Sequence, residues 1–126
     1  AVQVCQHDYY PKSATKFLNQ MQTVYPKKNW SSFMLMNCSK CTRLTPDYVN
    51  SASGLELHQF KWLNSDEQIG ALPLEWNWLA GEYDHKEDVK NIHFTEGGPW
   101  FDDYKETDYA DEWWAYYNET TKVGLA

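Results

Sequence analysis

The residues most able to do chemistry are a histidine and two glycines that share one short segment. His93 ends an apolar stretch, and Gly97 and Gly98 form a turn shortly after it. A neutral imidazole can ligate a divalent metal ion, and glycines without Cβ atoms let a diphosphate approach their backbone N–H groups closely. The segment therefore points to a metal or phosphate site, although a lone histidine in a strand more often serves as a structural hydrogen-bonding group.

Three cysteines offer a second kind of chemistry. Cys38 and Cys41 have the C-x-x-C spacing of half a zinc site or of a redox pair, but no second pair follows at a matching distance. Cys5 and His7 could complete a zinc site only through the fold. We therefore expect free or buried thiols, which favour a cytoplasmic location, whereas three N-x-S/T triplets point weakly the other way.

A basic stretch interrupts an acidic chain. Residues 8–29 carry Lys12, Lys16, Lys27 and Lys28, although the whole chain of 126 residues has a formal net charge of −7. Two interpretations stay open for this stretch. It is either a solvated loop or a loop that meets phosphate or another anion.

Four segments, taken in order, resemble motifs of the family 8-like glycosyltransferases of the GT-A fold. Residues 30–37 (WSSFMLMN) resemble the family's Asn-Ser/Ala-Gly turn with its following strand, and residues 66–68 (DEQ) resemble its Asp-Gln pair. Residues 72–77 (LPLEWN) resemble its Leu-Pro-x-x-Trp-Asn segment, and residues 93–100 (HFTEGGPW) resemble its C-terminal His-to-Pro-Trp motif. The resemblance covers roughly residues 1–105.

The resemblance implies an enzyme that transfers a hexose from a nucleotide diphosphate sugar to an unknown glycan or other acceptor, usually with retention of configuration. It also implies Mn²⁺ or Mg²⁺ on the donor diphosphate, with His93 as a metal ligand. By position it gives Asp66 and Gln68 catalytic roles beside the donor sugar. The remaining substrate contacts that it implies are Ser31, Ser32, Asn77, Gly97, Gly98 and Trp100.

Departures from the family pattern predict an incomplete enzyme. The chain has no Asp-x-Asp motif, Gly98 stands where the family often has Lys, and Trp30 stands where Asn is expected. The chain also opens at Ala1 inside a predicted strand. We therefore expect residues 1–126 to form a single domain, the C-terminal part of a truncated GT-A glycosyltransferase that is inactive by itself.

Composition excludes some partners and leaves alternatives open. An acidic chain repels nucleic acid, and no apolar run approaches the roughly 18 residues of a transmembrane helix. With seven Trp and nine Tyr, aromatic residues make up 17% of the chain, so it should fold. The aromatic side chains also suit a non-catalytic carbohydrate-binding domain or a protein-interaction domain.

The order of predicted elements favours a mixed α/β architecture, a sheet flanked by helices. Alternating apolar and polar residues predict a strand at the start of the chain, and Thr45 followed by Pro46 predicts the start of a helix. We expect strands over residues 1–7, 33–36 (buried) and 91–95, an extended segment over 72–79, and helices over 45–53, 55–62, 65–70 and 108–117, with a helix-compatible stretch over 14–22.

Overall fold

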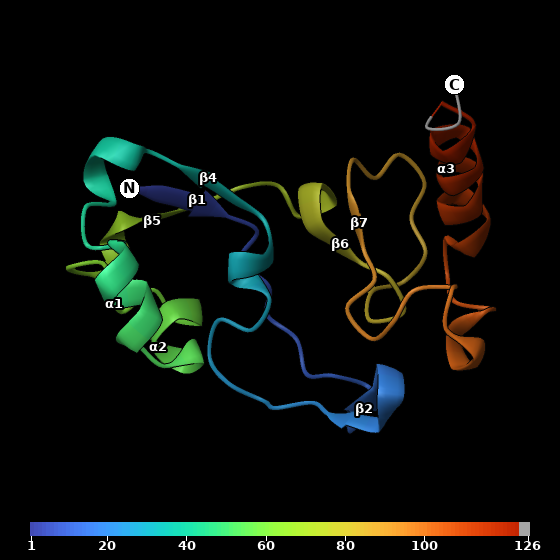
Figure 1. Ribbon diagram of the computed structural model, residues 1–126, viewed down its shortest axis with the longest axis horizontal. Helices are drawn as coiled ribbons and strands as arrows, with labels where there is room; N and C mark the ends of the chain where they lie inside the picture. Colours follow the sequence, from blue (N-terminus) through green and yellow to red (C-terminus); the bar gives the residue numbers. More distant parts are fainter. Residues whose placement is uncertain (124–126) are drawn as a thin grey trace. The chain divides into compact units, whose positions relative to one another are not determined.

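The computed structural model describes residues 1–123 and confirms a small mixed α/β architecture (Figure 1). The chain divides into two compact units. The first unit contains Ala1–Tyr10 and Val24–Asn77, and the second contains Pro11–Thr23 and the residues from Trp78 onward. Short 3-10 helices join the main elements, over Phe17–Asn19, Trp30–Ser32, Cys38–Lys40, Asp66–Gln68, Leu74–Asn77 and Asp102–Tyr104.

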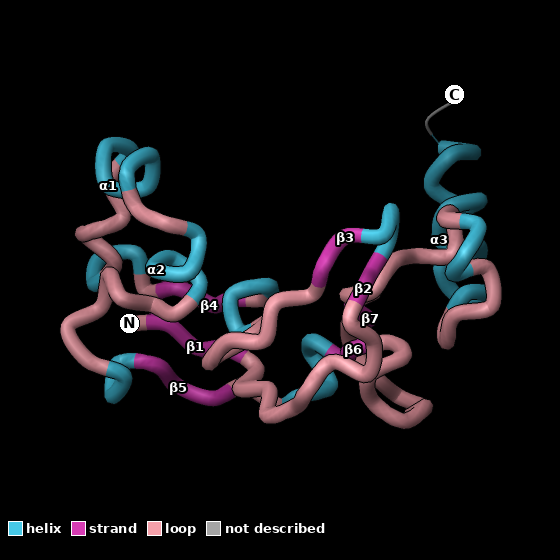
Figure 2. The backbone as a smooth tube through the Cα atoms, turned by 90° about the horizontal axis from the view of Figure 1, so that it is seen from below, coloured by secondary structure: helices cyan, strands magenta, loops and turns pink. Residues whose placement is uncertain are grey.

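A three-stranded sheet forms the centre of the first unit (Figure 2). Strand β1 (Val2–Val4) pairs antiparallel with β4 (Met34–Met36) and parallel with β5 (Ile69–Ala71). The alternation that predicted the first strand is confirmed, because Val2 and Val4 are buried and Gln3 is exposed. One face of the sheet therefore carries the core, where the buried residues are Val2, Val4, Cys41, Phe60, Trp62, Leu63 and Ile69.

Helices α1 (Pro46–Ser51) and α2 (Gly54–His58) cover this buried face through Tyr48 and Leu57. The predicted start of α1 is confirmed: Thr45 Oγ1 accepts a hydrogen bond from the Tyr48 N–H at 3.2 Å. Ser53 caps α2 in the same way. The helix predicted over residues 55–62 is shorter, because the chain leaves α2 near Phe60, whose φ is +60°.

Strand β4 corrects one sequence expectation. The apolar run over residues 33–36 predicted a buried strand, but β4 is an edge strand, and Leu35 is 60% exposed. A run of apolar residues predicts a strand, but it does not predict which elements pack against that strand and bury it. Leu35 lies opposite Gln3 on the face of the sheet that the helices leave open.

The second unit is built from two small strand pairs and a helix. Strand β6 (Trp78–Leu79) pairs parallel with β7 (Ile92–His93), and helix α3 spans Ala110–Val123. The predicted helix-compatible stretch over residues 14–22 is instead a hairpin of β2 (Thr15–Lys16) and β3 (Gln20–Met21). Leu18 and Asn19 take positive φ angles of 56° and 55° in its turn, which no right-handed helix contains.

The segment over residues 72–79 was predicted to be extended, but most of it is a 3-10 helix, Leu74–Asn77. Pro73 restricts only its predecessor, Leu72, and allows a helical turn to start after it. None of the helices in residues 1–123 has the length and apolar character that a membrane crossing requires.

Candidate functional site

A chain of hydrogen bonds joins four polar residues in the first unit. Asn77, 1% exposed, donates from Nδ2 to Ser32 Oγ at 2.8 Å and lies 3.1 Å from His7 Nε2. Ser32 Oγ in turn donates to the Asn29 carbonyl at 2.7 Å. The Asn77 amide N–H can only donate, so His7 Nε2 is the acceptor in this contact. The buried Asn77 amide and the buried His7 ring nitrogen therefore satisfy each other.

This network fixes the turn over Trp30–Ser32. The Trp30 indole N–H donates to the His7 carbonyl at 2.8 Å, and Asn29 holds a left-handed conformation with φ of +63°. Asn29 Nδ2 also donates to the Tyr9 hydroxyl. The predicted sugar contacts Ser32 and Asn77 therefore do come together, but in a network around the buried Asn77 amide that fixes the turn.

Two other predicted site residues of this unit make contacts of their own: Ser31, which is half-buried, and Asp66, which is exposed. Ser31 Oγ lies 2.6 Å from His58 Nδ1. Asp66 Oδ1 accepts from Lys27 Nζ at 2.9 Å, and the Asp66 side chain is 70% exposed. Lys27 Nζ also donates to the Gln59 carbonyl, which leaves its third ammonium hydrogen for another acceptor.

A hollow of about 290 Å³ lies beside these groups, between residues 7–10 and 24–28. Two lysines, Lys27 and Lys28, and one carboxylate, Asp8, line it together with Tyr9, Tyr10 and Tyr25. The Lys28 ammonium lies 5.0 Å from the centroid of the Tyr25 ring, and that ring lies 6.3 Å from the His58 ring. Lysines beside aromatic faces suit an anion that carries a ring system.

The basic stretch had indicated the lysines of this hollow, but nothing in the sequence indicated His58 or Tyr25. Those two side chains reach the site from α2 and from a loop, so only the fold brings them there. Gln68, a predicted catalytic residue, serves the backbone instead, since its Oε1 accepts from the Asn64 N–H at 3.1 Å.

The predicted glycine turn lies in the second unit, where aromatic rings cover it. Gly97 and Gly98 are buried. A Cβ atom at Gly97 would lie 2.7 Å from the Tyr104 ring, and one at Gly98 would lie 1.7 Å from the Trp100 ring. The need for glycine at this turn therefore comes from close packing. Trp100 itself is 49% exposed and packs against Trp113, with ring centroids 4.8 Å apart.

His93 keeps one property of a metal ligand and lacks another. Its Nδ1 is buried without a hydrogen-bond partner among the described residues, and burial lowers the pKa of its imidazole, so the ring is neutral. However, residues 1–123 contain no group of three or more His, Cys, Asp or Glu side chains placed to hold a metal ion. These residues do not by themselves fit a Mn²⁺ or Mg²⁺ site. The three cysteines are free thiols, with Cys5 and Cys41 buried and Cys38 exposed.

Sequence reasoning missed a pair of carboxyl groups in the second unit. Glu82 is 7% exposed, and its Oε2 accepts from the Lys12 N–H at 3.1 Å. Burial, together with a hydrogen bond to Glu82, raises the pKa of Glu96 to about 7. Glu96 therefore keeps its proton to near neutral pH, because a buried second carboxylate beside Glu82 would be repelled. No local motif signals a pairing of this kind.

Comparison with known proteins finds a long relative. Over 120 residues the chain is 48% identical to "Protein CDI" of Arabidopsis thaliana, a match that covers 90% of this chain and 46% of that protein. The chain thus spans about half the length of the curated relative. No protein-family model matches the sequence. No solved structure matches it either.

These findings correct the family assignment. The prediction that the chain belongs to the family 8-like glycosyltransferases is wrong, since no family model matches and the relative is a protein of another name. The four motifs are short and built from common residue types, so they can occur in order without common descent. Trp30 and Gly98, which depart from the family pattern, already indicated this.

Proposed function

We propose that this chain contributes a nucleotide-sugar-binding surface to a longer protein that transfers a hexose from a nucleotide diphosphate sugar. The observation that carries the proposal is the hollow lined by Lys27, Lys28 and tyrosines, with His58 and Asp66 in contact with its lining. Lysine ammonium groups attract a diphosphate, and tyrosine rings stack on a base or a sugar. Ser31 and Asp66 offer hydrogen bonds to hydroxyls.

The match to a relative of about twice the length supports one part of this proposal, that the chain belongs to a longer protein. The chain lacks an Asp-x-Asp motif, and its described residues supply at most the imidazole of His93 toward a cation. In this proposal the other ligands for Mn²⁺ or Mg²⁺ come from outside these residues. The same proposal includes the GT-A fold, with the mixed sheet as one part of it.

Calorimetric binding to the full-length protein tests the proposal, with UDP-glucose and GDP-mannose as probes in MnCl₂. We expect micromolar binding of one of them, and Lys28→Ala weakens it about tenfold, equal to about 1.4 kcal/mol. Lys61→Ala is the matched control, because Lys61 is exposed and lies outside the hollow. Absence of binding to both probes, or equal binding by Lys28→Ala and native protein, would contradict the proposal.

Carbohydrate binding without catalysis is a second candidate, because the aromatic side chains of α3 are largely exposed. It predicts glycan binding that needs neither nucleotide nor metal ion. Turnover of a nucleotide sugar by the full-length protein would decide against it.

A further inference from the structure

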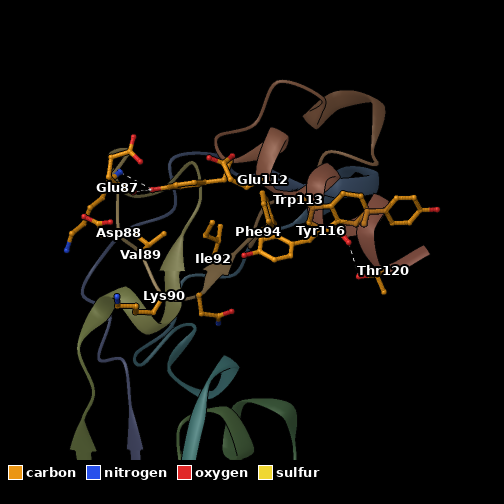
Figure 3. A pocket seen from close by; sticks show the side chains of 14 residues that line it. Glu87, Asp88, Val89, Lys90, Ile92, Phe94, Glu112, Trp113, Tyr116 and Thr120 are labelled. Atoms are coloured by element: carbon orange, nitrogen blue, oxygen red, sulfur yellow. Dashed lines mark hydrogen bonds between the residues drawn. The ribbon is translucent and has the colours of Figure 1, made fainter. Parts of the chain in front are cut away.

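The second unit contains a groove of about 620 Å³ between the loop over residues 86–91 and helix α3 (Figure 3). This volume falls in the range of about 300–1,000 Å³ that small-molecule sites occupy. Figure 3 shows Ile92 and Phe94 lying between the loop residues Glu87 to Lys90 and the α3 residues Tyr116 and Thr120. The groove thus has a charged end and an aromatic end, with an apolar stretch between them.

The two walls of the groove are fastened to each other. The buried Tyr109 hydroxyl, at the start of α3, accepts from the Lys86 N–H at 2.9 Å and donates to the Lys86 carbonyl at 2.8 Å. The His85 ring stacks on the Tyr109 ring at 4.7 Å, and His85 Nδ1 lies 2.7 Å from Asp108 Oδ1. Because the loop is tied to the helix, the groove is preformed and a ligand loses little free energy in ordering it.

The aromatic end presents ring faces. Trp113 and Tyr117 lie one turn apart on α3 and stack with centroids 5.2 Å apart and planes 15° apart, so each covers one face of the other. Trp113 also packs against Trp100, so the rings that remain open to a ligand are Tyr116 and Tyr117. Tyr117 is 47% exposed and Tyr116 is 72% exposed. Rings of this kind combine an apolar face with a polar tip, as do the pyranose rings of sugars, whose C–H groups gather on one face.

The charged end determines which ligands fit. The groove is lined by three acidic residues, Glu87, Asp88 and Glu112, and by two basic residues, Lys86 and Lys90. The whole chain carries a net charge of −7. An anionic glycan or a nucleic acid would meet more repulsion than attraction there. An uncharged polyhydroxyl ligand can instead donate hydrogen bonds to the carboxylates.

We propose that this groove binds a short uncharged oligosaccharide, with sugar rings against Tyr116 and Tyr117 and hydroxyls donating to Glu87 and Glu112. The inference rests on the proposed function and deepens it, because an enzyme that transfers a hexose needs a site for the molecule that receives it. The groove is then the site for a glycan acceptor.

Titration calorimetry of the full-length protein with cellopentaose, chitopentaose and mannopentaose tests this site, with pentagalacturonate as the anionic comparison. We expect binding of at least one neutral probe and weaker binding of the anionic one. Tyr116→Ala and Tyr117→Ala should each weaken binding about five- to tenfold. Both residues are well exposed, so these two variants should fold. Trp113→Ala is avoided because the loss of this packed side chain could unfold the helix.

Trp76→Ala is the control, an exposed aromatic residue of the first unit that does not line the groove. Lys28→Ala separates this site from the donor site, since it should weaken UDP-glucose or GDP-mannose binding and leave oligosaccharide binding unchanged. Three results would overturn the groove proposal: no binding of any neutral probe, preference for pentagalacturonate, or equal loss in Trp76→Ala. Self-association that Tyr116→Ala abolishes, without glycan binding, would assign the face to a second copy instead.

Discussion

At the residue scale, Asn77 stabilises the first unit through one amide group with two partners, the buried His7 and the exposed Ser32. Asn77→Ala leaves the buried His7 Nε2 without its donor, whereas the Ser32 hydroxyl can turn to water. We expect the free energy of unfolding to fall by about 2–3 kcal/mol, measured by urea denaturation. Asn64→Ala is the control, because Asn64 is exposed and bonds to Gln68 only through its backbone. A change below about 0.5 kcal/mol in Asn77→Ala would show that this network does not stabilise the fold.

The carboxyl pair gives a second prediction at the residue scale. The pKa of Glu96 rises from 4.5 to about 7 on folding, so between these values the unfolded chain has lost a proton that the folded chain keeps. The pair therefore makes stability fall as the pH rises from about 4.5 to about 7, with no further loss above that window. Glu96→Gln keeps a donor for Glu82 and removes the titration. It should match native stability near pH 4.5 and exceed it at pH 8.

Chemical denaturation at pH 4.5, 6 and 8 measures this difference. Glu106→Gln controls for the loss of one negative charge, because Glu106 is exposed in the same unit. Lys12, whose charge opposes the shift, stays unchanged in both variants. If Glu96→Gln and native protein respond to pH in parallel, folding does not raise the pKa of Glu96.

At the scale of single elements, the start of α1 offers a test of a local signal. Thr45→Ala removes the hydroxyl that accepts from the Tyr48 N–H, and it should lower the free energy of unfolding by about 1 kcal/mol. Thr42→Ala, exposed and outside the helix, is the matched control and should change stability little. Equal effects in a thermal melt of the two variants would mean that the cap does not stabilise α1.

Elements set by neighbouring residues were predictable, whereas those set by distant residues were not. Thr45, Pro46 and the alternation around Val2 act within one turn or one strand, so the sequence alone located α1 and β1. The exposure of Leu35 depends on which strands and helices lie beside β4, which a run of apolar residues does not encode. The helix-compatible stretch expected over residues 14–22 was wrong for a similar reason, because Leu18 takes a positive φ angle that its residue type does not indicate.

The candidate site shows the same division. The basic stretch indicated Lys27 and Lys28, and residue types alone suggested Ser31 and Asp66 as polar contacts. His7 and Asn77 meet across 70 residues of sequence, so their pairing follows only from the fold. Glu96 is an ordinary charged residue in the sequence, and only the fold buries it beside Glu82 and so raises its pKa.

At the scale of the whole molecule, the two units are interleaved along the chain. The backbone leaves the first unit after Tyr10, returns at Val24 and leaves again after Asn77. The proposed donor hollow belongs to the first unit, and the proposed glycan groove belongs to the second. Each site can therefore be tested with substitutions in one unit only.

The length of the relative leads to a last prediction about activity. The match covers 46% of that protein, and the described residues here lack a set of metal ligands. We therefore expect the 126-residue chain to bind UDP-glucose or GDP-mannose in the presence of Mn²⁺ without releasing UDP or GDP. The full-length protein should release the nucleotide at a measurable rate, because it adds the residues that neutralise the leaving diphosphate. Anion-exchange chromatography of the nucleotide products measures both. Release by the short chain would place the complete catalytic site within these residues, whereas failure of both proteins to release nucleotide would leave glycan binding as the function.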